Sequence, residues 1–177
     1  KVEAGKTYTL RETVAPDGYA ITTDTTFTLD ADGKIDTTKT TTKISADGVL
    51  HVEDAKTSVS ISKVDINTKE ELEGALIQIL DADGKVVAEW TSTKEVHKVE
   101  GLKTGVKYTL HEKAAPENYD VAEDTIFVLK ADGTIDTEKT TSTISGGVLL
   151  IKDKPEDALI IKISKVEAGA GTELADL

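Results

Sequence analysis

Apolar and polar residues alternate along several short stretches of this chain, and a period of two is the pattern of a half-buried β-strand. Within residues 59–63 the alternation places Val59, Ile61 and Lys63 on one face of the predicted strand. The same arrangement returns about one hundred residues later, in residues 161–165. Because helical periodicity is weak throughout, the pattern predicts an all-β fold.

Two further alternating stretches carry an acid in line with their apolar residues. Residues 149–153 place Asp153 on the apolar face, and residues 50–54 do the same for Asp54. Charged side chains are rarely buried unless they are paired. A carboxyl group at a position expected to face the core therefore needs a chemical explanation.

Turn signals separate these strands. Asp-Gly pairs at 32–33, 83–84 and 132–133 lie between strand-like stretches and predict hairpin turns. The Thr-rich segments 37–43 and 137–143 favour strands or extended edges, because β-branched residues are enriched there.

One phrase of sequence occurs twice, at residues 8–19 and 108–119. It reads Tyr-Thr-Leu-x-Glu and then, after two residues, Ala-Pro-x-x-Tyr. Each copy places a glutamate, Glu12 or Glu112, in its strand-like part. A period of about one hundred residues is one domain length, which predicts a tandem array of modules.

The repeat divides the chain into three parts. Residues 57–156 are expected to form a complete module, residues 1–56 the C-terminal part of a preceding one, and residues 157–177 the first strands of a following one. Equivalents of residues 76–97 are missing from both end parts. The chain, which starts at Lys1, is therefore expected to be a piece of a longer protein.

Composition narrows the class of protein. Only 38% of the 177 residues are hydrophobic and 4% are aromatic, so each core must be small and aliphatic. Small modules benefit from an additional staple, and with no cysteine that staple cannot be a disulfide. The net charge of −12, with no basic stripe, argues against nucleic-acid binding. No apolar run approaches the roughly 18 residues of a membrane span.

Three ionisable residues of the complete module fall in register with apolar strand positions: Lys63, Glu112 and Asp153. If they are buried together, desolvation favours a neutral amine and protonated carboxyl groups. A neutral amine is a nucleophile, and a protonated glutamate can polarise the aspartate carbonyl. Proximity would then allow an amide to form between Lys63 and Asp153 with loss of water.

The stretches around these residues form a recognisable set. They are Ile-Ser-Lys-Val-Asp at 61–65, Leu-Glu-Gly-Ala at 72–75, Leu-His-Glu-Lys-Ala-Ala-Pro-Glu-Asn-Tyr at 110–119 and Ile-Lys-Asp-Lys-Pro at 151–155. This set resembles the CnaB-type domains (SpaA-like, collagen-adhesin B) of Gram-positive surface proteins and pilins. The resemblance implies tandem Ig-like or prealbumin-like β-sandwich modules.

The resemblance also implies an autocatalytic isopeptide bond, in which Lys63 is the nucleophile, Glu112 the catalytic acid and Asp153 the acceptor. In the partial modules, Glu12 and Asp54 match the last two roles and Lys165 matches the first. Many members of the family use asparagine as the acceptor, whereas both copies here carry aspartate. The expected leaving group is therefore water instead of ammonia.

The function expected from the resemblance is that of an extracellular structural stalk, cross-linked within each module and partnered by neighbouring repeats, and not of an enzyme with turnover. A ligand-binding adhesin module is one alternative. Another is a polymer, in which the tail strand of one copy completes the head module of the next. The three histidines lack ligand spacing, and no cofactor or metal is expected.

Overall fold

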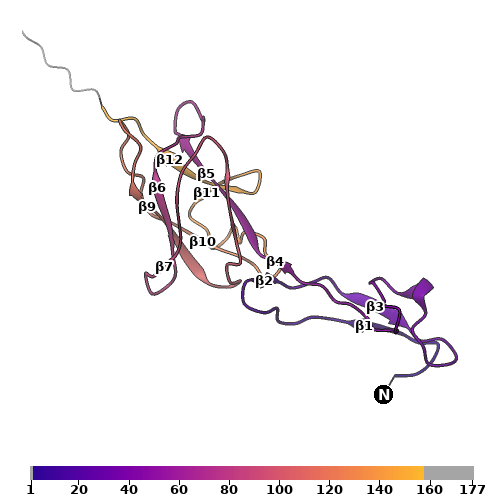
Figure 1. The fold of residues 1–177 in the computed structure, drawn as a ribbon. Helices are drawn as coiled ribbons and strands as arrows, with labels where there is room; N and C mark the ends of the chain where they lie inside the picture. Colours follow the sequence, from indigo (N-terminus) through magenta and orange to yellow (C-terminus); the bar gives the residue numbers. More distant parts are fainter. Residues whose placement is uncertain (1, 158–177) are drawn as a thin grey trace, which may run out of the picture.

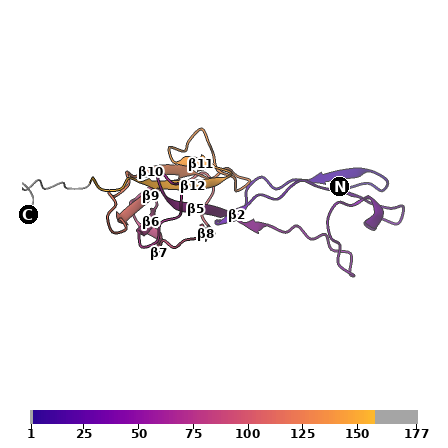
Figure 2. The same ribbon diagram turned by 90° about the horizontal axis from the view of Figure 1, so that it is seen from above.

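The computed structural model describes residues 2–157, which form a β-sandwich and a long, narrow head that extends from one end of it (Figures 1 and 2). The sandwich contains β5 (Ser58–Asp65), β6 (Leu76–Leu80), β7 (Val86–Thr91), β8 (His97–Glu100), β9 (Lys107–Ala114), β10 (Thr125–Val128), β11 (Thr143–Ser145) and β12 (Val148–Asp153). One sheet has the order β10-β9-β6-β7, and the other β11-β12-β5-β8.

The first and last strands of the sandwich, β5 and β12, are parallel neighbours in one sheet. Their register pairs Lys63 with Ile151 and Asp65 with Asp153. Along β12 the buried positions alternate, which confirms the strand predicted at 149–153. The strand predicted at 59–63 is also confirmed, as the centre of β5.

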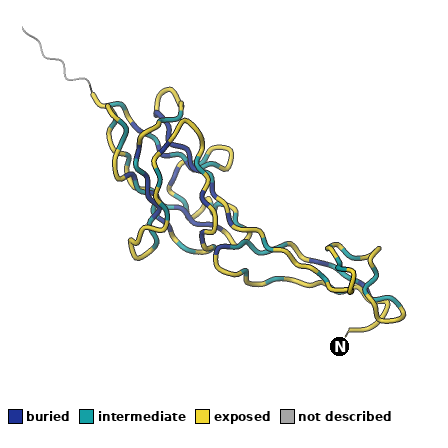
Figure 3. Tube along the Cα trace, viewed as in Figure 1, coloured by how far each residue is buried: buried dark blue, intermediate teal, exposed yellow. Residues whose placement is uncertain are grey.

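The core lies between the two sheets and is aliphatic, as composition predicts (Figure 3). Its fully buried members include Ile77 and Ile79 of β6 and Leu149 of β12. The main aromatic contact joins Tyr108 and Phe127, whose ring centroids lie 5.5 Å apart. Inward positions on both sheets thus build one compact interior in a short module.

The three Asp-Gly pairs form hairpin turns of one kind, as predicted. In the β6–β7 turn, Asp81 N donates to Lys85 O at 2.9 Å, and Gly84 N donates to Asp81 O at 3.1 Å. The glycine has a φ of +78° there, a conformation that glycine adopts without strain. The turns at residues 30–34 and 130–134 repeat both bonds.

The head is built from two small antiparallel pairs and one short helix. One pair is β1 (Thr7–Leu10) with β3 (Thr25–Thr28), and the other is β2 (Tyr19–Ala20) with β4 (Ala55–Lys56). A 3-10 helix, η1 (Thr37–Lys39), follows β3. Most of the head is exposed or half-buried (Figure 3).

The strand predicted at 50–54 does not form in the head. Only Leu50 makes an isolated bridge, to Ile44, and residues 51–54 have no strand beside them in the described part of the chain. The corresponding strand of the sandwich, β12, is held between β11 and β5. Alternation alone therefore does not establish a strand at residues 50–54, because a strand also needs a neighbour that pairs with its backbone hydrogen-bonding groups.

The prediction for the Thr-rich segments is also largely wrong. Residues 37–39 form η1, because the Asp36 carboxylate accepts hydrogen bonds from both Thr38 N, at 3.0 Å, and Thr38 Oγ1, at 2.6 Å. The second segment becomes a strand only at Thr143, where β11 begins. Local capping by aspartate outweighs β-propensity here.

Leu110 and Leu10 occupy the same position of the repeated phrase, yet Leu110 is 2% exposed and Leu10 is 44% exposed. We expect Leu110→Ala to lower the free energy of unfolding of the sandwich by about 2–5 kcal/mol, because it leaves a cavity. Urea unfolding monitored by the fluorescence of Trp90, the single tryptophan, measures this. Leu10→Ala is the matched control, with an expected change within about 0.5 kcal/mol; equal effects would contradict the burial difference.

Candidate functional site

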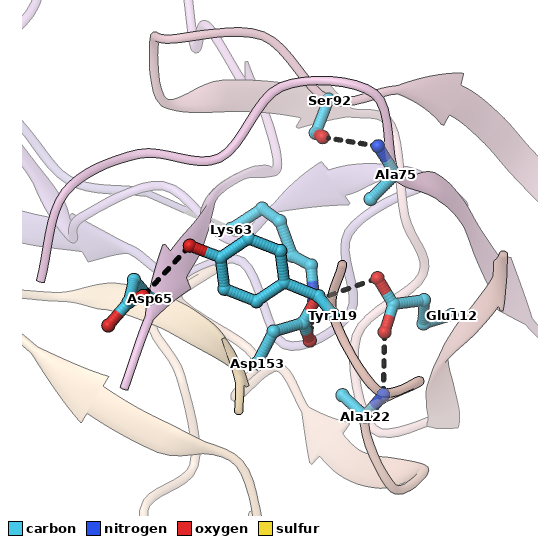
Figure 4. Close-up of polar contacts among 8 residues, drawn as sticks. All are labelled: Lys63, Asp65, Ala75, Ser92, Glu112, Tyr119, Ala122 and Asp153. Carbon is cyan, nitrogen blue, oxygen red and sulfur yellow. Dashed lines mark hydrogen bonds and ion pairs between the residues drawn. The ribbon is translucent and has the colours of Figure 1, made fainter. Parts of the chain in front are cut away.

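Lys63, Asp153 and Glu112 converge inside the sandwich (Figure 4). Lys63 on β5 and Asp153 on β12 come from neighbouring strands of one sheet, whereas Glu112 comes from β9 of the facing sheet. Lys63 lies opposite Ile151 in the register, so its long side chain runs along the strand pair to reach Asp153. The site is therefore assembled across both layers.

The lysine nitrogen lies between two carboxylates. Lys63 Nζ is 2.8 Å from Glu112 Oε1, and it donates a hydrogen bond to Asp153 Oδ1. The other oxygen of the glutamate, Oε2, accepts a hydrogen bond of 2.6 Å from the backbone N–H of Ala122. That bond fixes the orientation of the Glu112 carboxylate from outside the trio.

All three side chains are shielded from solvent: the exposed fractions of the residues are 2% for Lys63, 2% for Glu112 and 0% for Asp153. Desolvation by burial lowers the pKa of the Lys63 ammonium, and the neighbouring Glu112 carboxylate opposes that shift. A lowered pKa increases the fraction of neutral, nucleophilic amine near neutral pH.

The second carboxylate oxygen of Asp153, Oδ2, is buried and has no hydrogen-bond partner among the described residues. A buried carboxylate with an unmatched oxygen is costly, since buried charges are normally paired and hydrogen-bonded. Asp153 is therefore incompletely hydrogen-bonded in the core.

The head repeats part of this geometry. Glu12 Oε2 accepts a hydrogen bond of 2.8 Å from Thr22 N, as Glu112 does from Ala122. Glu12 and Asp54 are both half-buried. The head thus holds the equivalents of Glu112 and Asp153, whereas Lys165, predicted for the following module, lies outside the described residues.

A second polar contact lies close to the trio and was not predicted. The Tyr119 hydroxyl donates a hydrogen bond of 2.9 Å to Asp65 Oδ2 (Figure 4). Backbone N–H groups of Thr68 and Asn67 donate to the other oxygen, Oδ1. These bonds, Thr68 first, lower the pKa of the Asp65 carboxyl. The only signal in the sequence was the recurrence of the tyrosine in the repeated phrase.

Within residues 2–157, no group of three or more His, Cys, Asp or Glu side chains has the geometry of a metal site. No helix in that part of the chain is long and apolar enough to span a membrane.

Two facing four-stranded sheets, closed by neighbouring first and last strands, define a prealbumin-like β-sandwich. A family model described as "SpaA: Prealbumin-like fold domain" matches residues 1–44 and 57–143. Since these ranges make up most of the chain, the protein belongs to the SpaA prealbumin-like domain family. A search of curated proteins gives no match.

Solved structures with a similar fold include the shaft pilin SpaA from Lactobacillus rhamnosus GG (22% identity, 87% of this chain and 66% of that chain, TM-score 0.44). Another is the pilus adhesin SpaC from Lactobacillus rhamnosus GG (20% identity, 88% and 25%, TM-score 0.48). A third is the pilus-presented adhesin Spy0125 (Cpa), with 30% identity, 48% and 18% coverage and a TM-score of 0.40. The chain thus spans a quarter or less of each of the two adhesins.

The hydrogen bond from Tyr119 to Asp65 leads to a prediction about the pKa of Asp65 and the stability of the fold at low pH. Because the pKa of Asp65 is lower in the folded state, its carboxylate stabilises the fold at neutral pH, and that stabilisation is lost as the pH falls below about 4. Tyr119→Phe removes one donor, so we expect the pKa of Asp65 to rise towards its usual value, as followed by carboxyl NMR titration. Tyr19→Phe, in the head, should leave it unchanged; identical titrations of wild type and Tyr119→Phe would refute the coupling.

Proposed function

We propose that Lys63 and Asp153 are joined by an intramolecular amide, formed autocatalytically with the help of Glu112. The observation that carries this proposal is the buried trio itself, in which Lys63 Nζ contacts an oxygen of each carboxylate. The unpartnered Asp153 Oδ2 adds support, because an amide is neutral and removes both the lysine and the aspartate charge from the core.

The reaction balances without a cofactor. The neutral amine nitrogen of Lys63 attacks Cγ of Asp153, so that an Nζ–Cγ bond forms and one Cγ–O bond breaks. The departing oxygen leaves as water, with one proton from the amine and one from the carboxyl group. Glu112 accepts the proton from nitrogen, delivers it to oxygen and ends unchanged, which is single-turnover self-modification and not enzymatic turnover.

The step is favoured because the Lys63 amine and the Asp153 carboxyl group are held in contact. An amine and a carboxyl group in water condense poorly, whereas reacting groups held in contact have very large effective molarities. Here the parallel pairing of β5 and β12 holds the two groups, and the Ala122 N–H orients the glutamate beside the lysine nitrogen. The lowered pKa of Lys63 favours the reactive form.

The bond would act as a staple in a module that has no cysteine. It would close a loop of 90 residues. By analogy with disulfides, loop closure on this scale lowers the entropy of the unfolded chain by an amount worth about 4–5 kcal/mol. It would also tie together the strands at which the chain enters and leaves the module.

We propose on this basis that the protein is part of a structural stalk on a bacterial surface, of the pilus or adhesin kind, whose partners are neighbouring repeats. Membership of the SpaA family and the tandem phrase support this role. The proposal includes the division into residues 1–56, 57–156 and 157–177. It extends the same chemistry to Lys165, Glu12 and Asp54 wherever complete modules contain them.

The intact mass of the denatured chain tests the proposal. We expect the wild-type mass to be lower than the sequence mass by one water, and Glu112→Gln to restore the full mass because the proton carrier is lost. An unmodified wild-type mass would refute the cross-link.

Glu12→Gln is the matched control for this experiment, since it changes the same position of the repeated phrase in the head. It should retain the loss of one water. Trp90 fluorescence of each variant verifies that the sandwich is folded, so that a restored mass reports chemistry and not misfolding.

The mechanical role is tested by pulling single molecules through their ends. With Lys63 and Asp153 joined, the chain between them, a sequence separation of 90 residues, cannot be stretched when the ends are pulled. Glu112→Gln should release about 300 Å of additional chain at about 3.3–3.6 Å per residue. Equal extensions of wild type and variant would contradict a cross-link that carries the pulling force.

A further inference from the structure

We propose that the loop carrying the Ala-Pro-x-x-Tyr phrase is the seat on which each module docks the next, and that residue 18 sets how closely the two approach. The partner is the following module of the same chain. The proposal rests on contacts between the head and the sandwich, and it does not depend on the cross-link.

The connection between the head and the sandwich is very short. Thr57 is the only residue between β4 and β5, and it is buried. Its N–H donates to Gly18 O at 3.0 Å, and its hydroxyl donates to Leu102 O at 2.5 Å. Its own carbonyl accepts from Gly101 N at 2.9 Å. The residue that links the modules is thus bonded to both sides.

Gly18 lies directly against the backbone of the sandwich. A Cβ atom at this position would stand 2.8 Å from Gly101 O, closer than real Cβ contacts allow, and a backbone atom cannot move aside as a side-chain tip can. The φ of Gly18 is +82°, which also favours glycine. Any side chain here would push the head away from the sandwich.

Further contacts surround this close approach. Ile21 N donates to Ala131 O at 2.9 Å, in the turn between β10 and β11. On another loop of the sandwich, Lys103 pairs with Asp17 at 2.7 Å. Since the head contacts two separate loops in addition to Thr57, its orientation is fixed in more than one direction.

The complete module repeats the backbone part of this seat at its far end. Glu156 N donates to Asn118 O at 2.9 Å, as Thr57 N does to Gly18 O. Val121, at the position of Ile21, is 55% exposed and therefore open to a partner. Asn118 has a φ of +68° but carries a side chain, so a following module cannot approach it as closely as Gly101 approaches Gly18. Successive joints of the stalk would then differ in tightness.

Spin labels test the joint in the intact chain. The protein has no cysteine, so Lys34→Cys in the head and Lys85→Cys in the sandwich give one specific pair of labels. Pulsed electron double resonance measures the distribution of distances between them. Gly18→Asn introduces the residue found in the second copy. Gly48→Asn is the matched control, because Gly48 also has a φ of +82° but an added Cβ there meets nothing within 4 Å.

We expect one narrow distribution in the wild type and in Gly48→Asn, and a broader or displaced one in Gly18→Asn. A broad wild-type distribution, or a Gly18→Asn result that matches Gly48→Asn, would overturn the proposal. A second pair, Lys34→Cys with Glu53→Cys, monitors the head alone. If Gly18→Asn disturbs that pair as well, the variant has changed the head itself. The width of the wild-type distribution then tests whether the head and the sandwich are held in one orientation.

Discussion

The parallel pairing of β5 with β12 is the constraint on which the rest of the structure depends. Parallel strands cannot be joined by a tight turn, so the remaining strands of the module lie between them in the sequence. In this register the residue opposite Asp153 is Asp65, and Lys63 lies two positions before Asp65 on β5. A lysine side chain spans that offset, and the facing sheet then supplies Glu112 from β9.

This pairing and the facing sheet together bring three ionisable groups into a small aliphatic core, which is unfavourable unless their charges are matched. Lys63 contacts both carboxylates, but one oxygen of Asp153 is left without a donor in the described residues. A permanent ion pair would keep the cost of desolvation, whereas an amide would not. On the proposed function, this imperfect pairing is the starting state of the condensation. The chain enters the sandwich through β5, beside the head, and leaves it through β12 at the opposite end (Figure 1).

Much of the fold and the composition of the trio could be predicted from the sequence. Alternation located β5 and β12, Asp-Gly pairs located the turns, and the repeated phrase singled out Glu112. The strand expected at 50–54 is absent because alternation does not specify a neighbour. The role of Ala122 was invisible, since it acts through its backbone N–H and not through its side chain.

The contact between Gly18 and Gly101 was beyond prediction for a different reason. Each glycine reads as an ordinary turn residue, and only the packing of one part on the other brings the two together. Such contacts depend on how modules meet, whereas periodicity and motifs report on single strands and turns. The sequence difference between Gly18 and Asn118 acquires a meaning only when the joint is known.

The most direct test of the central claim is a peptide map of the proteolysed wild-type chain by tandem mass spectrometry. The account predicts one branched species, in which the peptide containing Lys63 is joined through its side chain to the peptide containing Asp153, with the mass of one water missing. Recovery of both peptides only in linear form would contradict it and leave the buried trio as a plain ionic contact.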